Sequence, residues 1–231
     1  MKETLRKGLP GLGLSLSEEI QNTLCAFGEA VVEQNKVMNL TAITEPTQVA
    51  KLHLLDSLSL LTLEELAGKR MIDVGCGAGF PGVPVKIACP GVQLTLLDSL
   101  GKRMQWLETV LPQLGITNAR CVTARAEEAI STRREKFDFA TSRAVARLNI
   151  LLELTAPYVR VGGAVLAMKG SAAREELAEA GNAIKKLGLK LEEVKDFPID
   201  GATHSVIILR KVAKNPPQYP RRYAKIKQSP L

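Results

Sequence analysis

The segment from Met71 to Gly82 constrains the fold of this chain more than any other, and it reads M-I-D-V-G-C-G-A-G-F-P-G. Four glycines follow a short apolar run, and Asp73 stands two residues before the first of them. Glycine loses more backbone entropy on folding than any other residue, so such a cluster indicates a turn that brings bare backbone against a ligand. A second acid, Asp98, ends the next apolar run. Two carboxylates at the ends of neighbouring strands, flanking a glycine turn, favour a nucleoside ligand that carries hydroxyls and a cationic group.

From Met71 onward the sequence repeats a pattern of strand, turn and helix, which predicts an α/β fold. Short buried strands that alternate with helices form parallel sheets with right-handed crossovers. The predicted strands are 70–74, 92–98, 119–124, 137–142, 163–169, 189–198 and 204–212, and the predicted helices are 82–88, 102–114, 127–134, 147–158 and 173–187. Only residues 199–203 separate the last two strands. This is too short for a helical crossover, so we expect the last pair to be antiparallel.

The residues before the glycine turn are predicted to form a helical cap. One helix is indicated by apolar residues on a single stripe at helical spacing, namely Ile20, Leu24, Phe27 and Val31. Ser15, followed three residues later by Glu18, resembles a capping box at its start. A second helix is expected over 46–63.

The composition excludes several classes of protein. No run approaches ~20 uninterrupted apolar residues, so no membrane span is expected. The charged segment from Met1 to Pro10 has no apolar signal core, which favours a cytoplasmic protein. The four cysteines have no C-x-x-C spacing and the chain has only two histidines, so we expect no metal site.

Positive charge is concentrated in the C-terminal segment. The net charge is +7, and the six Lys and Arg residues between Lys211 and Leu231 leave only +1 on the rest of the chain. Prolines at 216, 217, 220 and 230 argue against a regular helix there. The segment is expected to be either an arm that binds polyanions or a solvated, disordered terminus.

The glycine turn has two interpretations. Gly77-x-Gly79-x-x-Gly82 satisfies the dinucleotide fingerprint, but Asp73 would repel a pyrophosphate and no second domain remains for a nicotinamide. S-adenosylmethionine, with its ammonium, sulfonium and ribose diol, fits two acids better. Asp98 can accept both ribose hydroxyls, although it is also a typical turn or helix-capping residue.

Polar or turn residues also follow the next two strands. Ala126 and Glu127 come after the third strand and are candidates for adenine contacts, and Arg143 ends the fourth. In parallel sheets, ligands bind at the carboxyl edge where the strand order reverses. These positions therefore converge on one site.

The chain as a whole resembles a known family, the bacterial small-subunit ribosomal RNA guanine-N7 methyltransferases once called glucose-inhibited division protein B. The resemblance is carried, in order, by residues 35–44 (NKVMNLTAIT), 53–58 (HLLDSL), 73–82 (DVGCGAGFPG), 98–103 (DSLGKR), 125–127 (RAE), 142–146 (SRAVA), 169–170 (KG) and 221–223 (RRY). These motifs span nearly the whole chain.

The resemblance implies a seven-strand Rossmann-like class I methyltransferase sheet with an antiparallel last strand, preceded by an N-terminal helical extension. The expected division is a helical cap over 1–66, a methyltransferase domain over 67–212 and a basic tail over 213–231. The implied activity is transfer of a methyl group from S-adenosylmethionine to N7 of one guanine in the decoding region of 16S rRNA. The expected partner is the small ribosomal subunit, and nothing demands more than a monomer. Cofactor contacts carried over by position are Gly75, Phe80, Ala126, Glu127 and Arg143, in addition to Asp73, Gly77, Gly79 and Asp98.

Methylation at N7 needs little acid–base chemistry. Guanine N7 carries a free lone pair and no proton, so the protein mainly has to orient the reactants, and we expect no general base. We expect Arg143 to contact either the cofactor carboxylate or the guanine O6. The alternative is a surface ion pair with a neighbour such as Glu127.

Candidate RNA contacts are the cations Lys102, Arg103, Lys169, Arg221 and Arg222. His53 and Asp56 are three residues apart on one helical face, and they either line the RNA cleft or form a packing pair. Two other functional classes remain open at this stage. One is a nicotinamide oxidoreductase, and the other is an RNA-binding protein that senses the cofactor without turning it over.

Overall fold

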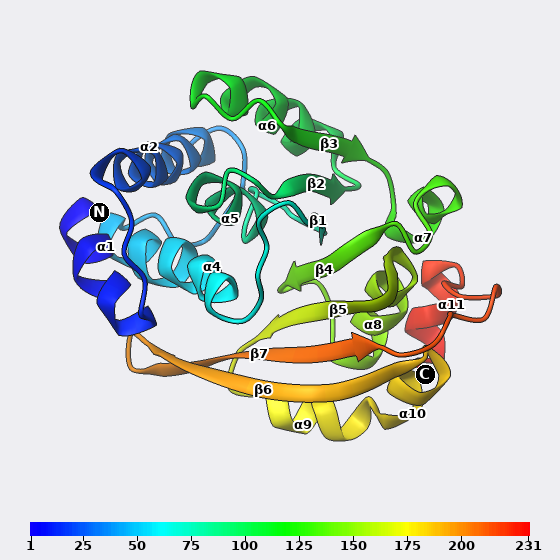
Figure 1. Cartoon of the computed structure of the whole chain (residues 1–231). Coiled ribbons are helices and arrows are strands. Elements are labelled where there is room, and N and C mark those ends of the chain that lie inside the picture. The colour runs from blue at the N-terminus through cyan, green and yellow to red at the C-terminus, as the bar shows by residue number, and fades with distance from the viewer.

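The computed structural model describes residues 1–231 and is built around one seven-stranded sheet with the order β3-β2-β1-β4-β5-β7-β6 (Figure 1). The strands are β1 (Arg70–Val74), β2 (Gln93–Asp98), β3 (Ala119–Thr123), β4 (Phe137–Arg143), β5 (Val159–Lys169), β6 (Leu189–Ile199) and β7 (Ala202–Lys211). The strands from β1 to β5 are parallel, and β7 runs antiparallel to both β5 and β6. The predicted α/β fold with an antiparallel last strand is therefore confirmed.

The strand order reverses at β1, which pairs with β2 on one side and with β4 on the other. Asp73 on β1 lies level with Leu96 on β2 and Thr141 on β4. The carboxyl end of β1 is thus the switch point at which open α/β sheets bind ligands.

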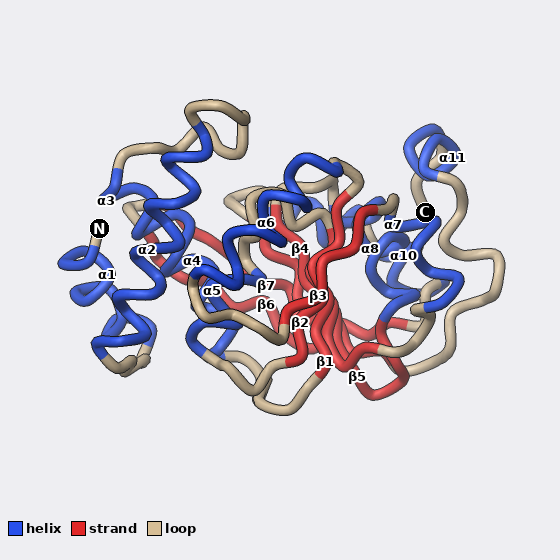
Figure 2. Tube along the Cα trace, turned by 90° about the horizontal axis from the view of Figure 1, so that it is seen from above, coloured by secondary structure: helices blue, strands red, loops and turns tan.

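Helices cover both faces of the sheet, which Figure 2 shows edge-on with its strands stacked behind one another. They are α1 (Lys2–Gly8), α2 (Glu18–Asn35), α3 (Pro46–Val49), α4 (Asp56–Leu58), α5 (Gly82–Ala88), α6 (Gly101–Gln113), α7 (Ala126–Ala129), α8 (Leu148–Thr155), α9 (Ala173–Glu179), α10 (Gly181–Lys186) and α11 (Tyr223–Gln228). None of them combines the length and hydropathy that a membrane span requires.

Two apolar cores result from the alternation of side chains along the strands. On β1, Met71 packs into the core beneath α1, α2, α5 and α6, whereas Ile72 packs into the core beneath α8 and α10. On β5, Leu166 faces the first core and Val165 the second. Both faces of the central strands are therefore buried, as expected for a parallel sheet.

The N-terminal cap differs from the prediction in two details. The cap of α2 is Ser17, whose hydroxyl accepts a hydrogen bond from Ile20 N at 3.3 Å, so the predicted capping box at Ser15 is wrong. The helix predicted over 46–63 is not regular. Its α-helical turns α3 and α4 flank a π-helical stretch, Ala50–Leu55, and a 3₁₀ turn, Ser59–Thr62, ends it. His53 lies within the π-helical stretch and Asp56 directly after it, and both contact Arg143 of β4.

Strand β5 begins at Val159, four residues before the predicted start at 163. Gly162 and Gly163 suggest a turn in the sequence, but the strand continues through them. A Cβ at Gly163 would lie 2.3 Å from Asp138 O on β4, so glycine here permits a close approach of two backbones.

The C-terminal segment is not a solvated, disordered terminus, because it packs on the domain. Its prolines flank a short helix instead of excluding one, since α11 lies between Pro220 and Pro230. Ile226 is fully buried and Tyr219 nearly so. Arg221 donates to both carboxylate oxygens of Glu153, a fully buried residue of α8, at 2.8 and 2.6 Å. A buried carboxylate without a partner is destabilising, and Arg221 supplies the cation that pairs with Glu153.

Candidate active site

The turn between β1 and α5 has a backbone that only glycine adopts easily. Gly75, Gly77 and Gly79 have φ of 73°, 55° and 95°. A Cβ at Gly75 would also lie 2.4 Å from a methyl carbon of Val145. The amides of Gly75 and Cys76 donate to Leu97 O at 2.7 and 3.2 Å, which ties the turn to the end of β2.

Asp73 lies fully buried beneath this turn. Its Oδ2 accepts a hydrogen bond from Gly82 N at 2.8 Å, and its Oδ1 has no partner. Burial raises the pKa of this carboxyl to about 7, although the Gly82 amide and the charge of Arg143 oppose the shift. Asp73 therefore fixes the start of α5 and keeps one oxygen free for a further donor.

Asp98 holds the other side of the turn. Its Oδ2 accepts from Gly77 N and its Oδ1 accepts from Leu100 N, both at 2.9 Å. A carboxylate has about four acceptor positions, so each oxygen retains one lone pair. The same side chain thus acts as a turn residue and still offers two acceptors for a diol.

A cleft of about 940 Å³ opens at this edge of the sheet. Segments far apart in sequence build its walls: the cap, the glycine turn, the ends of β4 and β5, and the β6–β7 hairpin. Among the predicted cofactor residues, those that line it are Gly75, Gly77, Phe80 and Arg143. Asp98 does not line the cleft but is linked to it through Gly77.

Ala126 and Glu127 lie apart from this cleft, at the start of α7. The carbonyl of Ala126 accepts from the Tyr158 hydroxyl at 2.5 Å, and Glu127 Oε1 accepts from Tyr223 N of the tail at 3.3 Å. The C-terminal segment therefore lies beside the two residues that we expected at the adenine.

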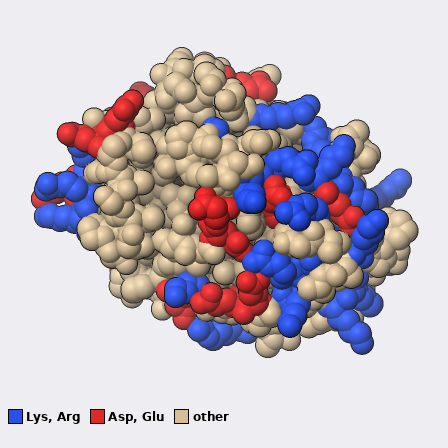
Figure 3. All heavy atoms as spheres, viewed as in Figure 1, with Lys and Arg blue, Asp and Glu red and all other residues tan.

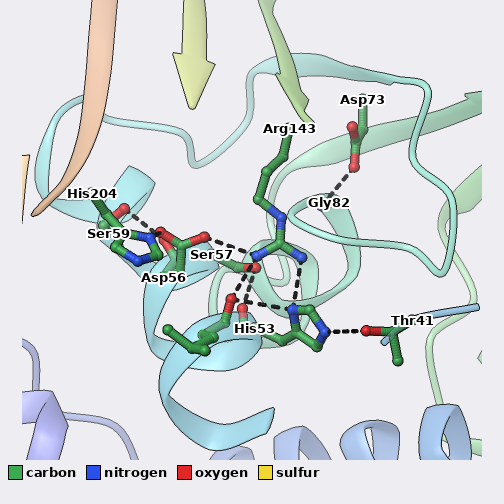
Figure 4. A network of polar contacts seen from close by, with 10 residues as sticks. Thr41, His53, Asp56, Ser57, Ser59, Asp73, Gly82, Arg143 and His204 are labelled. Atoms are coloured by element: carbon green, nitrogen blue, oxygen red, sulfur yellow. Dashed lines mark hydrogen bonds and ion pairs between the residues drawn. The ribbon is translucent and has the colours of Figure 1, made fainter. Parts of the chain in front are cut away.

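Arg143 is the centre of a polar network at the wall of the cleft (Figure 4). Its Nη1 donates to Asp56 Oδ2 and to Leu52 O, both at 2.8 Å. Its Nη2 lies 3.0 Å from His53 Nδ1. The predicted alternative, an ion pair with Glu127, is wrong because Asp56 of the cap is the partner.

The arginine also determines the state of His53. Nδ1 of His53 lies 3.0 Å from Nη2 of Arg143, which only donates, and 3.1 Å from the carbonyl of Leu52, while Nε2 lies 2.8 Å from Thr41 Oγ1. Burial and the charge of Arg143 lower the pKa of His53 to about 4. His53 is therefore neutral at pH 7, and neither of its nitrogens is free.

Asp56 joins the cap to two strands. Its second oxygen, Oδ1, lies 2.9 Å from Nδ1 of His204 on β7. Burial alone would raise the pKa of Asp56, but the hydrogen bond from His204 and the charge of Arg143 outweigh it and lower the pKa. The same hydrogen bond raises the pKa of His204. His53 and Asp56 are thus no direct pair, since Arg143 links them.

Aromatic contacts complete the wall. The His53 ring stacks on Phe80 with centroids 4.6 Å apart, and the guanidinium carbon of Arg143 lies 5.3 Å from the same ring. Phe80 follows the glycines directly, so the turn and the network support each other.

The predicted RNA contacts are distributed differently. Arg103 and Lys169 line the cleft; Arg103 donates to Asn39 O at 2.9 Å, and Lys169 pairs with Glu176 at 2.8 Å. Lys102 and Arg222 are exposed outside it, and Arg221 is engaged by Glu153. His204 and Thr41 were missed. His204 is 148 residues from Asp56, and no local pattern connects them.

Comparison with known proteins agrees with this geometry. The family described as rRNA small subunit methyltransferase G matches residues 20–204. The ribosomal RNA small subunit methyltransferase G of Alkaliphilus oremlandii is 42% identical over 236 residues, covering 100% of this chain and 99% of that protein. The protein of the same name from Desulfitobacterium hafniense is 44% identical over 224 residues, covering 95% and 93%.

Solved structures show the same fold at low identity. Precorrin-6y C5,15-methyltransferase from Geobacter metallireducens superposes with a TM-score of 0.54 at 14% identity, over 75% of this chain and 92% of that one. Geranyl diphosphate C-methyltransferase from Streptomyces coelicolor, solved with S-adenosyl-L-homocysteine, gives 0.54 at 14% identity over 68% and 78%. The sheet is therefore that of a class I methyltransferase, and the chain belongs to the rRNA small subunit methyltransferase G family.

Proposed function

We propose that this protein transfers the methyl group of S-adenosylmethionine to N7 of a guanine in the decoding region of 16S rRNA. The observation that carries the proposal is the cleft at the switch point of the sheet. There a glycine turn held by two carboxylates faces an arginine that the cap fixes in place. A cytoplasmic monomer acting on the small ribosomal subunit accords with this chemistry.

The residues present fit S-adenosylmethionine. The bare backbone at Gly75 leaves no room for a side chain, Asp98 retains two acceptors for a ribose diol, and the orphaned Oδ1 of Asp73 suits the ammonium, directly or through water. Ala126 and Glu127 would hold the adenine at the next strand end. When bound, the cofactor supplies a methyl group on a positively charged sulfur.

A pyrophosphate-bearing cofactor fits poorly. Dinucleotides place their phosphates on free amides at the start of the helix. Here the amide of Gly82 is taken by Asp73 and that of Gly77 by Asp98. Two carboxylates thus occupy the donors that a pyrophosphate would need.

The chain's own residues serve orientation rather than proton transfer. His53 cannot act as a base because both of its ring nitrogens have partners. Two N–H donors of Arg143 go to Leu52 O and Asp56 Oδ2, and its Nη2 faces His53 Nδ1; the remaining N–H groups are available for the guanine O6 or the cofactor carboxylate. A site of this kind accelerates the reaction mainly by holding the two reacting atoms in line and about 3 Å apart.

We further propose that three parts of the chain have different roles. The cap, residues 1–66, supplies His53 and Asp56; the domain over 67–212 supplies the cofactor turn and Arg143; and residues 213–231 brace the adenine end. Arg103 and Lys169, which line the cleft, contact the RNA at its mouth.

The test is mass-spectrometric mapping of small-subunit rRNA from cells with and without this protein. We expect one N7-methylguanine to disappear in its absence. Wild-type protein should restore it, as should the control Lys190→Ala, an exposed residue of β6, whereas Arg143→Ala should not. An unchanged set of methylated guanines would refute the proposal.

A further inference from the structure

A second cavity, of about 1030 Å³, lies at the opposite edge of the sheet, where β1 to β4 begin. It is built from the start of β1 at Arg70, from residues 90–95 and 117–120, and from residues 132, 133, 136 and 137 at the beginning of β4. The five residues of β1, at ~3.3 Å each, separate it from the glycine turn by roughly 15 Å. The methyl-transfer cleft therefore does not include it.

The side chains around this cavity, which we call the amino-edge groove, carry charge of one sign. Its charged lining residues are all cations, namely Arg70, Lys86, Arg120, Arg133 and Lys136. Figure 3, which views the molecule from the side of the strand starts, shows Lys and Arg gathered on the right half, on the side of α7 and α11. Acidic residues lie at the centre, in the lower part and at the upper left of that face, and a few stand among the cations of the right half.

Internal contacts occupy only some of these cations. Lys86 is buried and donates to Pro90 O and Val92 O, so it is structural. Arg70 lies 3.9 Å from Asp138, a carboxylate that Arg160 also engages at 2.6 Å. Arg120 and Lys136 are exposed and form no ion pair or side-chain hydrogen bond. At least two positive charges therefore face solvent without compensation.

The uncharged lining favours a phosphate backbone over other anions. Gln93, Thr117 and Asn118 add neutral donors. No large apolar side chain is exposed in the groove: Phe137 is buried, and the exposed ones on this molecule, Val37, Leu100, Val161, Leu191 and Val212, lie elsewhere. The groove thus offers neither a surface on which bases can stack nor an apolar anchor for a membrane.

We propose that the amino-edge groove binds the phosphodiester backbone of the rRNA substrate, as a contact separate from the methyl-transfer cleft. The inference rests on the proposed function in that it takes rRNA as the substrate. Because the two sites lie on opposite edges of the sheet, an RNA that occupies both must pass around the domain. The substrate is then a large folded RNA rather than a short loop, and the groove reads shape and charge without reading sequence.

The test compares the full-length double variant Arg120→Ala/Lys136→Ala with wild type. The matched control, Arg6→Ala/Lys190→Ala, removes the same charge from exposed residues that form no ion pair. Binding to a labelled 16S rRNA fragment is followed by fluorescence anisotropy at several salt concentrations. Each lost phosphate contact reduces the magnitude of the negative slope of log K against log salt by about 0.7. We therefore expect the slope of the double variant to be shallower by about 1.4, and its binding at low salt to be about tenfold weaker.

Methyl transfer to the same RNA gives a second readout. The groove variant should raise KM for RNA by about the same factor, without a matching fall in kcat, and the control should change neither binding nor KM. Equal salt slopes for wild type and groove variant would overturn the proposal. So would a groove-dependent binding to phosphatidylglycerol vesicles with RNA binding unchanged.

The two proposals fail in different ways. If wild type binds the RNA through the groove but produces no N7-methylguanine, the proposed function is wrong. If wild type methylates the RNA and the groove variant does so with the same KM and salt slope, only the groove proposal is wrong.

Discussion

Removing Asp56 tests how the cap controls the active site. The side chains of Asp56 and Arg143 are 6% and 17% exposed, and their ion pair spans 2.8 Å. Breaking a buried pair by deleting one partner costs about 3–5 kcal/mol, because a charge remains buried alone. Arg143 keeps Leu52 O and His53, so we expect Asp56→Ala to lose about 3 kcal/mol of unfolding free energy.

Activity should suffer beyond this loss of stability. Without Asp56 the guanidinium is no longer fixed on two sides, and a displacement of about 1 Å at a reacting centre costs roughly 100-fold in rate. We therefore expect kcat/KM of Asp56→Ala to fall about 100-fold under conditions where the variant is folded. Asp56→Asn keeps one acceptor oxygen and the shape of the side chain, so its kcat/KM should fall only about tenfold.

The assay is transfer of tritium from methyl-labelled S-adenosylmethionine to small-subunit rRNA, with circular dichroism melts of each variant. Glu29→Ala, which removes an exposed acid from α2, is the matched control and should match wild type in both. A folded Asp56→Ala protein with kcat/KM within twofold of wild type would refute the idea that the cap positions Arg143.

Three further outcomes follow from the contacts. Asp98→Ala should weaken S-adenosylhomocysteine binding at least about 100-fold in calorimetry, since hydrogen bonds to a charged acceptor contribute about 1.5–3 kcal/mol each; equal affinity would remove Asp98 from the ribose site. Arg221→Ala leaves Glu153 buried and unpaired and should lower the unfolding free energy by about 3–5 kcal/mol. The control, Arg222→Ala at the exposed neighbour, should change it by no more than about 0.5 kcal/mol. Equal denaturation midpoints for the two variants would contradict a stabilising role of the Arg221–Glu153 pair. The pKa of Asp73 is raised from 3.8 to about 7, so its neutral form stabilises the fold at low pH and this contribution is lost as pH rises through 7. The unfolding free energy of Asp73→Asn relative to wild type, measured by urea titration, should therefore rise by up to about 4 kcal/mol between pH 4 and pH 8. A difference between the two proteins that stays constant over this pH range would contradict the ionisation of a buried carboxyl.

Much of the fold could be predicted because the local signals and the tertiary structure agree. The strand at 70–74 was predicted from an apolar run that stops at glycines, and β1 has these bounds. The short link between the last two strands sufficed to predict their antiparallel pairing, which the register confirms. Such signals are local, so a sequence displays them directly.

The rest depends on contacts that local patterns do not encode. The tail was expected to be either a polyanion-binding arm or a disordered terminus because it is basic and rich in proline, yet a buried acid, Glu153, holds it on the domain. An isolated Glu within the apolar segment 148–155 was the one available signal that a cation must reach the core. Likewise, the spacing of His53 and Asp56 indicated a shared face, but their link through Arg143 and on to His204 arises only from the folded sheet.

The most direct test of the cofactor cleft is a crystal structure of the protein grown with S-adenosylhomocysteine. We predict the nucleoside across the glycine turn, with both ribose hydroxyls within hydrogen-bond distance of Asp98 and the adenine next to Ala126 and Glu127. A cleft without bound ligand at saturating concentration, or a dinucleotide with its pyrophosphate on the Gly77–Gly82 turn, would contradict the account.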